Sequence, residues 1–279
     1  MDWSHYSVPA MQLEARFGDR VVPAFCERPK SIWAMVAEAA ASHPDGEALV
    51  CGARRMNWRE VAQASADIAA GFEKLGLQSG DRVALLVGNR IEFVLAMFAA
   101  AHLGLVTVVL STRQQKPEIA YVLTDSGAKL LIHEATLADR LPDARDVPDL
   151  KYRISVDDGS GSQFTALLDN APSPQPASVG EQDTAMILYT SGTTGRPKGA
   201  MLAHCNVVHS SMVFASCLQL TAADRSIAAV PLAHVTGVVA NIVSMVRCAG
   251  TLIIVAEFKA EGNNHDRPLQ AAGRFSRPV

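Results

Sequence analysis

An apolar run at residues 185–189 stops abruptly and is followed by glycine and hydroxyl residues. Short uninterrupted apolar runs of this kind are typical of buried strands. Residues 190–199 then contain three glycines, three threonines and one serine, with Lys198 near the end. Glycines let the backbone come close to a ligand, and successive N–H groups in such a turn form a concave site for phosphate oxygens. The stretch therefore predicts a phosphate-binding loop at the end of a strand.

Three other interpretations of this stretch fit less well. A plain surface loop needs no such density of hydroxyl groups before Pro197 and Lys198. The Walker A pattern places glycine before its lysine and serine or threonine after it, whereas here Pro197 precedes Lys198 and Gly199 follows. The dinucleotide pattern G-x-G-x-x-G does not fit either.

Residues 189–199 read Y-T-S-G-T-T-G-R-P-K-G. This stretch closely resembles the signature loop of the adenylate-forming superfamily, the AMP-binding enzymes that include acyl-CoA synthetases, aryl-CoA ligases, luciferases and peptide-synthetase adenylation domains. In that family the loop wraps the β- and γ-phosphates of ATP. The resemblance implies that a small-molecule carboxylic acid is activated as an acyl-adenylate and then passed to a thiol, with ATP and Mg²⁺ as cofactors and CoA as co-substrate.

Lys198 and Thr194 are the candidate catalytic residues. A cation beside the charge that develops on pyrophosphate lowers the barrier electrostatically. The resemblance assigns triphosphate binding to the loop as a whole and does not rank its hydroxyls, some of which could merely satisfy their own turn. The candidate cofactor-binding residues are Thr190, Ser191, Gly192, Thr193, Thr194, Gly195, Lys198 and Gly199.

A second candidate site is His234, within the sequence P-L-A-H-V-T-G at residues 231–237. A lone histidine after a proline is more often structural or solvent-facing. The segment is similar to the family's P-L-F-H-x-x-G motif, which implies that His234 lines the acyl and adenylate pocket. Ala233 stands where the family often has an aromatic residue, so we expect a more open or differently filled pocket wall.

The remaining polar residues do not form a recognisable site. His204 and His209 are five residues apart and miss the i, i+4 spacing of a helical metal pair. No Ser-His-Asp set and no H-E-x-x-H motif is found, so no metal ligands are assigned. Asp183 and Asp224 precede strands and are expected to act as turn or cap residues.

Composition excludes some classes of protein. A net charge of -3 argues against a nucleic-acid-binding surface, and a hydrophobic fraction of 49% argues against global disorder. The five cysteines are widely spaced without a C-x-x-C pair, which indicates reduced thiols and a cytoplasmic protein.

The N-terminus has no secretory signal pattern. Residues 93–110 are apolar enough for a membrane check, but Gly104 divides them, which favours a buried helix and strand over a transmembrane segment.

Helical and strand patterns alternate along the chain. This order predicts an α/β fold with mainly parallel, doubly wound sheets covered by helices, and the resemblance implies an incomplete N-terminal domain of an adenylate-forming enzyme. Residues 1 to about 28 show little periodicity and are expected to wrap the surface. The expected helices are 32–42, 58–75, 91–103, 117–125, 204–218 and one ending near 248, and the expected strands are 48–51, 55–56, 82–87, 105–110, 129–132, 185–189, 227–230 and 251–255.

A proline-rich stretch of small residues near 170–180 is typical of a linker and indicates a boundary between subdomains. We expect a first α/β subdomain at 1–178 with an N-terminal wrap, the start of a second subdomain with the phosphate loop at 179–259, and an irregular tail at 260–279. The family's later elements are not found: an aromatic-Gly-x-Thr-Glu motif, a ribose-binding aspartate and a C-terminal domain with a catalytic lysine. The tail is either a disordered natural terminus or out-of-frame translation after a frameshift, and we favour the second as a hypothesis.

Two functions follow from these observations. The first is the N-terminal part of an ATP-dependent carboxylic acid–CoA ligase, with a fatty or aryl acid as substrate. The alternative is a catalytically inert truncated remnant that at most binds nucleotide. A generic NTPase is disfavoured by the spacing of the loop. The sequence leaves open the identity of the acid, the thiol acceptor and whether the protein forms an oligomer.

Overall fold

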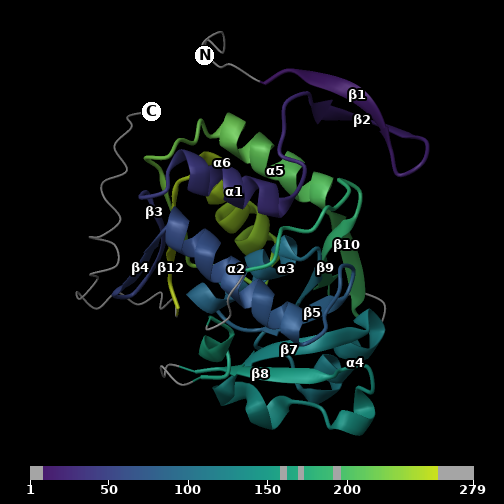
Figure 1. Cartoon of the computed structure of the whole chain (residues 1–279). Helices are drawn as coiled ribbons and strands as arrows, with labels where there is room; N and C mark the ends of the chain where they lie inside the picture. Colours follow the sequence, from purple (N-terminus) through teal and green to yellow (C-terminus); the bar gives the residue numbers. More distant parts are fainter. Residues whose placement is uncertain (1–8, 158–161, 169–172, 191–195, 257–279) are drawn as a thin grey trace.

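Two mainly parallel sheets, with helices between them and on their outer faces, form the body of the protein (Figure 1). The computed structural model describes residues 9–157, 162–168, 173–190 and 196–256. The six-stranded sheet has the order β10-β9-β6-β5-β7-β8, built from β5 (Arg82–Leu86), β6 (Val106–Val109), β7 (Ala128–Glu134), β8 (Tyr152–Val156), β9 (Thr184–Thr190) and β10 (Lys198–Ala203). The four-stranded sheet has the order β11-β12-β3-β4, built from β3 (Glu47–Cys51), β4 (Arg54–Asn57), β11 (Arg225–Ala228) and β12 (Thr251–Ile254). Strands β10 and β4 run antiparallel to their neighbours β9 and β3.

Helices cover both faces of the six-stranded sheet. Helix α3 contacts β3 on one side and β5 and β6 on the other, and all of it except Glu92 is buried. On the opposite face, α4 packs Ile119, Val122 and Leu123 into a second apolar cluster. The described helices are α1 (Ile32–Ser42), α2 (Trp58–Lys74), α3 (Ile91–His102), α4 (Lys116–Ser126), α5 (His204–Cys217) and α6 (Ser244–Cys248), with 3₁₀ turns η1 (Ala135–Arg140), η2 (Ala144–Asp146) and η3 (Thr165–Leu168) and a π-helix η4 (Thr236–Val243). The predicted doubly wound α/β fold is confirmed.

Local capping chemistry explains where several helices begin. The Ser31 hydroxyl accepts a hydrogen bond from the Ala34 N–H at 3.1 Å, as expected for an N-cap. Asn57 and Glu60 form a reciprocal capping box at the start of α2. These two starts were predicted from the sequence and are confirmed.

The apolar stretch at residues 93–110 forms a helix and a strand. Helix α3 ends at His102, and β6 begins at Val106. Between them Gly104 has φ +68°, and a Cβ there would lie 2.6 Å from the Ser79 hydroxyl oxygen. The division at glycine is therefore confirmed. Within the part of the chain that the structure describes, no helix combines the length and the apolar character needed to cross a membrane.

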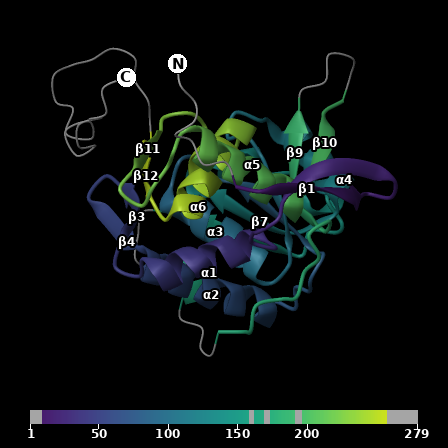
Figure 2. The ribbon, with the colours of Figure 1, turned by 90° about the horizontal axis from the view of Figure 1, so that it is seen from above.

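The N-terminal segment differs from its prediction. Residues that showed little periodicity form a hairpin of β1 (Met11–Arg16) and β2 (Arg20–Phe25), which extends away from the body beside α5 (Figures 1 and 2). Glu14 and Glu181 hold this hairpin through the guanidinium groups of Arg16 and Arg28, with N–O distances of 2.6 to 3.0 Å. We call these four residues the arginine–glutamate cluster. Glu181 is more than 150 residues away from Arg16 and Arg28, so local sequence patterns could not indicate the cluster.

Other elements also depart from the prediction. Strand β10 was not expected, because four of its six residues are exposed and leave no apolar pattern. Strand β11 covers Arg225–Ala228 instead of 227–230. The segment before Cys248 begins as the π-helix η4 and continues as α6. Both sheets combine strands from before and after residue 178, so the expected boundary does not separate one sheet from the other, and the division into two subdomains stays a prediction.

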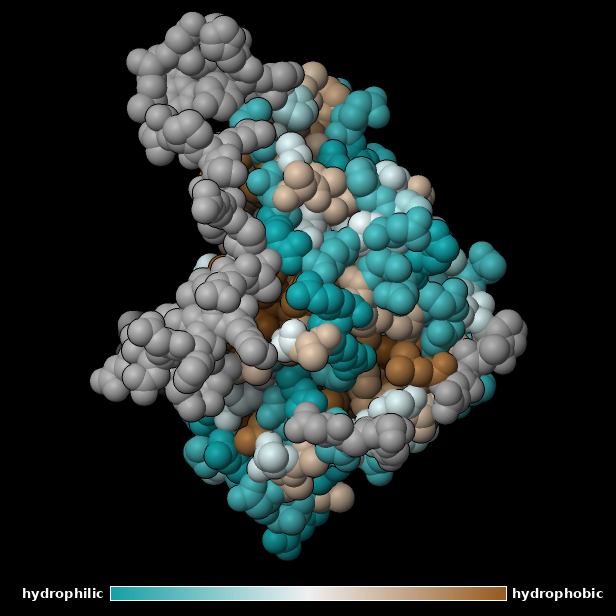
Figure 3. Space-filling view, turned by 90° about the vertical axis from the view of Figure 1, so that its left-hand side faces the viewer, coloured by the Kyte–Doolittle hydropathy of each residue, from teal (hydrophilic) through white to brown (hydrophobic). Residues whose placement is uncertain are grey.

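The edge strand β4 carries charge. Figure 3 shows the side of the molecule with β3 and β4, where hydrophilic side chains cover much of the described surface and apolar ones form separate patches. Arg54 and Arg55 of β4 are about half exposed and pair with Glu92 and Glu47. Charged residues on an edge strand disfavour pairing with other chains.

We predict that the protein loses stability as the pH falls below about 6.5. Burial lowers the pKa of His102, His133 and His204 from the ordinary 6.5, so these rings are neutral in the fold and take up protons on unfolding. The hydrogen bond from Arg28 lowers the pKa of Glu181 from 4.5 to about 2, which adds stability above pH 4.5 that is lost toward pH 2. Urea midpoints measured from about pH 8 to pH 4 should decline throughout the acid limb; a maximum near pH 5 would contradict this account.

Candidate functional site

The predicted phosphate loop connects two antiparallel strands. Thr190 ends β9, Lys198 begins β10, and the two residues are paired across the ladder. Both are exposed, and neither lies in a helix. The candidate residues Ser191, Gly192, Thr193, Thr194 and Gly195 lie outside the described residues, so their roles stay predictions.

Strand alternation shows which way the described ends of the loop point. Met186 and Leu188 belong to the main core on the α3 side of the sheet, whereas Ile187 and Tyr189 pack with the cluster on the α4 side. Because side chains alternate along a strand, Thr190 points to the α3 side. Its cross-strand partner Lys198 points the same way. The hydroxyl and the ammonium group are thus presented together, on the side of the sheet that faces the rest of the protein's core.

Gly199 has a packing reason to be glycine. A Cβ at this position would lie 2.8 Å from Cγ2 of Ile187 and 3.1 Å from Cζ of Tyr189. The phenol of Tyr189 lies over this space and donates a hydrogen bond of 2.6 Å to Asp125 on α4. Burial and this carboxylate raise the pKa of Tyr189, so it is a neutral donor at ordinary pH. Binding of cofactor by the Gly199 backbone stays a prediction.

His234 is exposed and lies just before the π-helix η4. Its backbone N–H donates a hydrogen bond to the carbonyl oxygen of Pro231 at 3.1 Å, and its backbone carbonyl oxygen accepts one from the Val238 N–H at 3.0 Å. Leu232 is fully buried, and Ala233 packs at the margin of the core. The segment is therefore anchored on one side and leaves the imidazole free to meet a ligand. π-Helical turns occur often at functional sites.

Asn89, which no motif in the sequence indicated, holds the His234 segment in place. Its side-chain oxygen accepts from Leu232 N–H at 2.8 Å, and its amide nitrogen donates to the carbonyl oxygens of Val230 and Val255 at 3.0 Å each. Its position directly after the strand ending at Leu86 could have drawn attention to it, because ligands of open α/β sheets bind beyond the carboxyl ends of the strands.

The two candidate sites lie at the same edge of the six-stranded sheet. Strands β9, β6 and β5 are parallel neighbours, so their carboxyl ends share one edge. Thr190 ends β9, and Asn89 follows β5 and contacts the His234 segment. Two strand spacings amount to about 10 Å. The fold thus brings Lys198 and the His234 segment, which belong to two separate motifs in the sequence, to the same edge of the sheet.

The residues that were assigned no catalytic role have structural partners. Buried His204 accepts from Ile32 N–H at 3.3 Å, and the His209 ring lies 5.1 Å from the Phe25 ring. Asp183 and Asp224 accept turn hydrogen bonds from Gly180 and Thr221, as expected. Across the described residues, no group of three His, Cys, Asp or Glu side chains could hold a metal ion.

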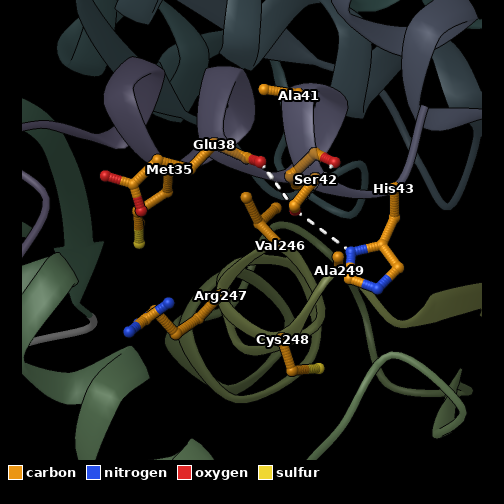
Figure 4. A pocket seen from close by; sticks show the side chains of 10 residues that line it. Met35, Glu38, Ala41, Ser42, His43, Val246, Arg247, Cys248 and Ala249 are labelled. Atoms are coloured by element: carbon orange, nitrogen blue, oxygen red, sulfur yellow. Dashed lines mark hydrogen bonds between the residues drawn. The ribbon is translucent and has the colours of Figure 1, made fainter.

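The surface has two hollows that the sequence did not indicate. A groove of about 570 Å³ lies between α1 and α6, with Met35, Ser42, His43 and Cys248 along its walls (Figure 4). In this view the Ser42 hydroxyl is already engaged with the Glu38 carbonyl and the His43 ring. The second hollow, about 650 Å³, is lined by Cys51, Asn89 and Phe164 among others. Because Asn89 lines this hollow and also contacts the His234 segment, the hollow lies at the same edge of the sheet as that segment.

Comparison with known proteins identifies the family of this chain. The family of AMP-binding enzymes matches residues 36–271. The long-chain-fatty-acid–CoA ligase FadD13 of Mycobacterium tuberculosis is 34% identical over 206 residues, which cover 74% of this chain and 41% of that protein. A 2-succinylbenzoate–CoA ligase of Bacillus velezensis is 36% identical over 204 residues, covering 73% and 40%.

A solved structure shows the same arrangement. The inhibitor-bound crystal structure of the N-terminal domain of FACL13 from M. tuberculosis superposes with a TM-score of 0.76 at 31% identity, covering 82% of this chain and 58% of that one. The chain spans about two fifths of the length of the curated relatives it matches. From the matched residues, the loop sequence and the shared architecture, the chain belongs to the family of AMP-binding enzymes.

Proposed function

We propose that this chain is the N-terminal part of an ATP-dependent carboxylic acid–CoA ligase. Thr190 and Lys198, exposed and paired at the loop end of the β9–β10 hairpin, carry the proposal, because they present a hydroxyl and a cation at the two ends of the family's signature loop. Lysine binds phosphate as a mobile point charge, and hydroxyls donate to phosphate oxygens. These residues fit the triphosphate of ATP.

The proposed reaction is the one that the resemblance to the family implies. A carboxylate oxygen attacks the α-phosphorus of ATP, the bond to the β-phosphate oxygen breaks, and pyrophosphate leaves; a CoA thiol then attacks the acyl carbonyl and AMP leaves. Lys198 opposes the negative charge that grows on the departing pyrophosphate. Mg²⁺ would enter with the ATP phosphates, since the described residues offer no cluster of their own for it.

The acid is proposed to be a fatty or aryl carboxylic acid. Ala233 and Leu232 give the His234 segment an apolar setting, and a small residue at 233 leaves room beside it. The relatives named above are ligases of a long-chain fatty acid and of 2-succinylbenzoate, which supports this class.

The five cysteines are all free, which fits a reducing compartment, and we place the reaction in the cytoplasm.

ATP-dependent function is tested by pyrophosphate exchange. Exchange of labelled pyrophosphate into ATP is measured with the full-length parent protein and a panel of fatty and aryl acids, and ATP binding is measured with the 279-residue chain. Acid-dependent exchange is the expected result for a ligase. Binding of ATP without exchange would favour the inert, nucleotide-binding alternative for this chain, and absence of both would remove the proposal.

Lys198→Ala is expected to weaken ATP binding about tenfold or more. A hydrogen bond to a charged group contributes about 1.5–3 kcal/mol, and 1.4 kcal/mol corresponds to a factor of ten. Isothermal titration with MgATP and with inorganic tripolyphosphate gives the two affinities. Lys129→Ala removes a lysine that pairs with Asp81 elsewhere and serves as the control. Equal affinities in wild type and Lys198→Ala would argue against a phosphate role for this lysine.

A further inference from the structure

Both described ends of the phosphate loop contact helix α4. At the first end, the Tyr189 hydroxyl donates to Oδ2 of Asp125 at 2.6 Å. This contact depends on Gly199, because a side chain there would collide with the Tyr189 ring. The strand that leads into the loop is therefore fixed to the last turns of α4.

At the second end, Arg196 lies over the ring of Tyr121, with Cζ 5.7 Å from the ring centroid. A guanidinium at this distance over an aromatic face is attracted by the ring's quadrupole. Among the described residues, no carboxylate forms an ion pair with Arg196. Tyr121 in turn meets Tyr189 edge-to-face, with ring centroids 6.4 Å apart at 85°. We call Tyr121, Asp125, Tyr189 and Arg196 the α4 clasp.

The α4 clasp lies on the opposite side of the hairpin from Lys198. Tyr189 packs toward α4, whereas Thr190 and Lys198 point to the α3 side, as strand alternation requires. Figure 2 shows α4 beside the β9–β10 hairpin. A ligand that meets Lys198 would therefore leave the clasp in place. The clasp can hold the backbone while the other face binds.

Holding both ends of a loop has a consequence for binding. A ligand that contacts both Thr190 and Lys198 is bound more tightly when these two residues are already held in position, because less ordering is then needed on binding. Tyr189 precedes Thr190 and Arg196 lies two residues before Lys198, so their contacts with α4 hold the end of β9 and the start of β10. An anchored start to β10 also keeps Lys198 at its position opposite Thr190.

We propose that Tyr121 and Asp125 of α4 are positioning residues for triphosphate binding, acting through Tyr189 and Arg196. The inference rests on the proposed function, since it concerns the same loop. Neither residue touches the ligand. The family's signature reads Y-T-S-G-T-T-G-x-P-K-G, and Arg196 occupies its variable position x, so this contact belongs to this chain and is not implied by the signature.

The test compares ATP affinities of variants of the 279-residue chain. Asp125→Ala and Tyr121→Leu are each expected to weaken MgATP binding about fivefold, with thermal midpoints close to that of wild type because neither side chain is buried. Tyr121→Phe keeps the aromatic face and should restore the wild-type affinity within twofold. A role in general stability would instead lower the thermal midpoint of Tyr121→Leu together with its ATP affinity.

A double-mutant cycle separates positioning from direct contact. If Arg196 acts through Tyr121, Arg196→Gln should add little to the loss in Tyr121→Leu. Full additivity would mean that Arg196 binds phosphate itself and would overturn the assignment of Tyr121. Unchanged ATP affinity in both Asp125→Ala and Tyr121→Leu, beside a tenfold loss in Lys198→Ala, would overturn the clasp alone. Failure of wild type to bind ATP would overturn the proposed function and the clasp together.

Discussion

Glu181→Ala is expected to release the N-terminal hairpin, lowering its free energy of opening by about 3 kcal/mol. The reason is that Arg16 and Arg28 are only 5% and 8% exposed, so removing Glu181 leaves two nearly buried cations with Glu14 as their remaining partner. Loss of one partner from a buried ion pair is costly because the desolvated charge stays behind. We place the effect at the low end of the usual range, because Glu14 still contacts both guanidinium groups.

Native-state hydrogen exchange measures this directly. Amides of β1 and β2 should exchange roughly a hundredfold faster in Glu181→Ala, since 1.4 kcal/mol is a factor of ten. Asp45→Ala is the matched control, because the Arg59–Asp45 pair is 65% and 78% exposed and such pairs contribute little. If the hairpin amides exchanged at wild-type rates in Glu181→Ala, the arginine–glutamate cluster could not be what holds the hairpin.

Gly237→Ala is the second substitution with a large expected effect, about 3 kcal/mol of lost stability. A Cβ at residue 237 would lie 2.4 Å from the carbonyl oxygen of Pro231 and 2.6 Å from Cα of Leu232. These are backbone atoms of a tightly held segment, so they cannot rotate away as a side chain could. The collision would displace the segment that carries His234 and break the hydrogen bond between Leu232 and Asn89.

Urea denaturation of Gly237→Ala gives the stability change. Gly180→Ala is the control, because its Cβ would meet only the flexible Asp183 carboxylate, at 3.3 Å; its stability should stay within about 0.5 kcal/mol of wild type. A Gly237→Ala variant as stable as wild type would show that the segment yields easily, and the rigid placement of His234 would then be wrong.

Much of the fold could be predicted because it is written in local patterns. Ser31, Asn57 and Gly104 each mark an element end by their own chemistry, and the structure has these ends where expected. Strand β10 could not be found this way, because its exposed residues carry no alternation. The β1–β2 hairpin depends on Glu181, a partner far away in the sequence.

The residues of the candidate site also differ in whether a local sequence pattern could indicate them. Lys198 and His234 belong to contiguous motifs and were found. Asn89 and Asp125 contact Leu232 and Tyr189, which lie 143 and 64 residues away in the sequence, and no spacing within a motif records such contacts. The face to which Lys198 points also required the antiparallel register with Thr190, and hence the strand that the sequence did not indicate.

Amide chemical-shift mapping with MgATP tests the central claim most directly. The backbone signals of Thr190, Arg196, Lys198 and Gly199 should shift in proportion to saturation, and inorganic tripolyphosphate should shift the same amides. Shifts confined to other places, such as the groove between α1 and α6 around Met35 and Val246, with no response at the described ends of the loop between β9 and β10, would show that the triphosphate binds elsewhere.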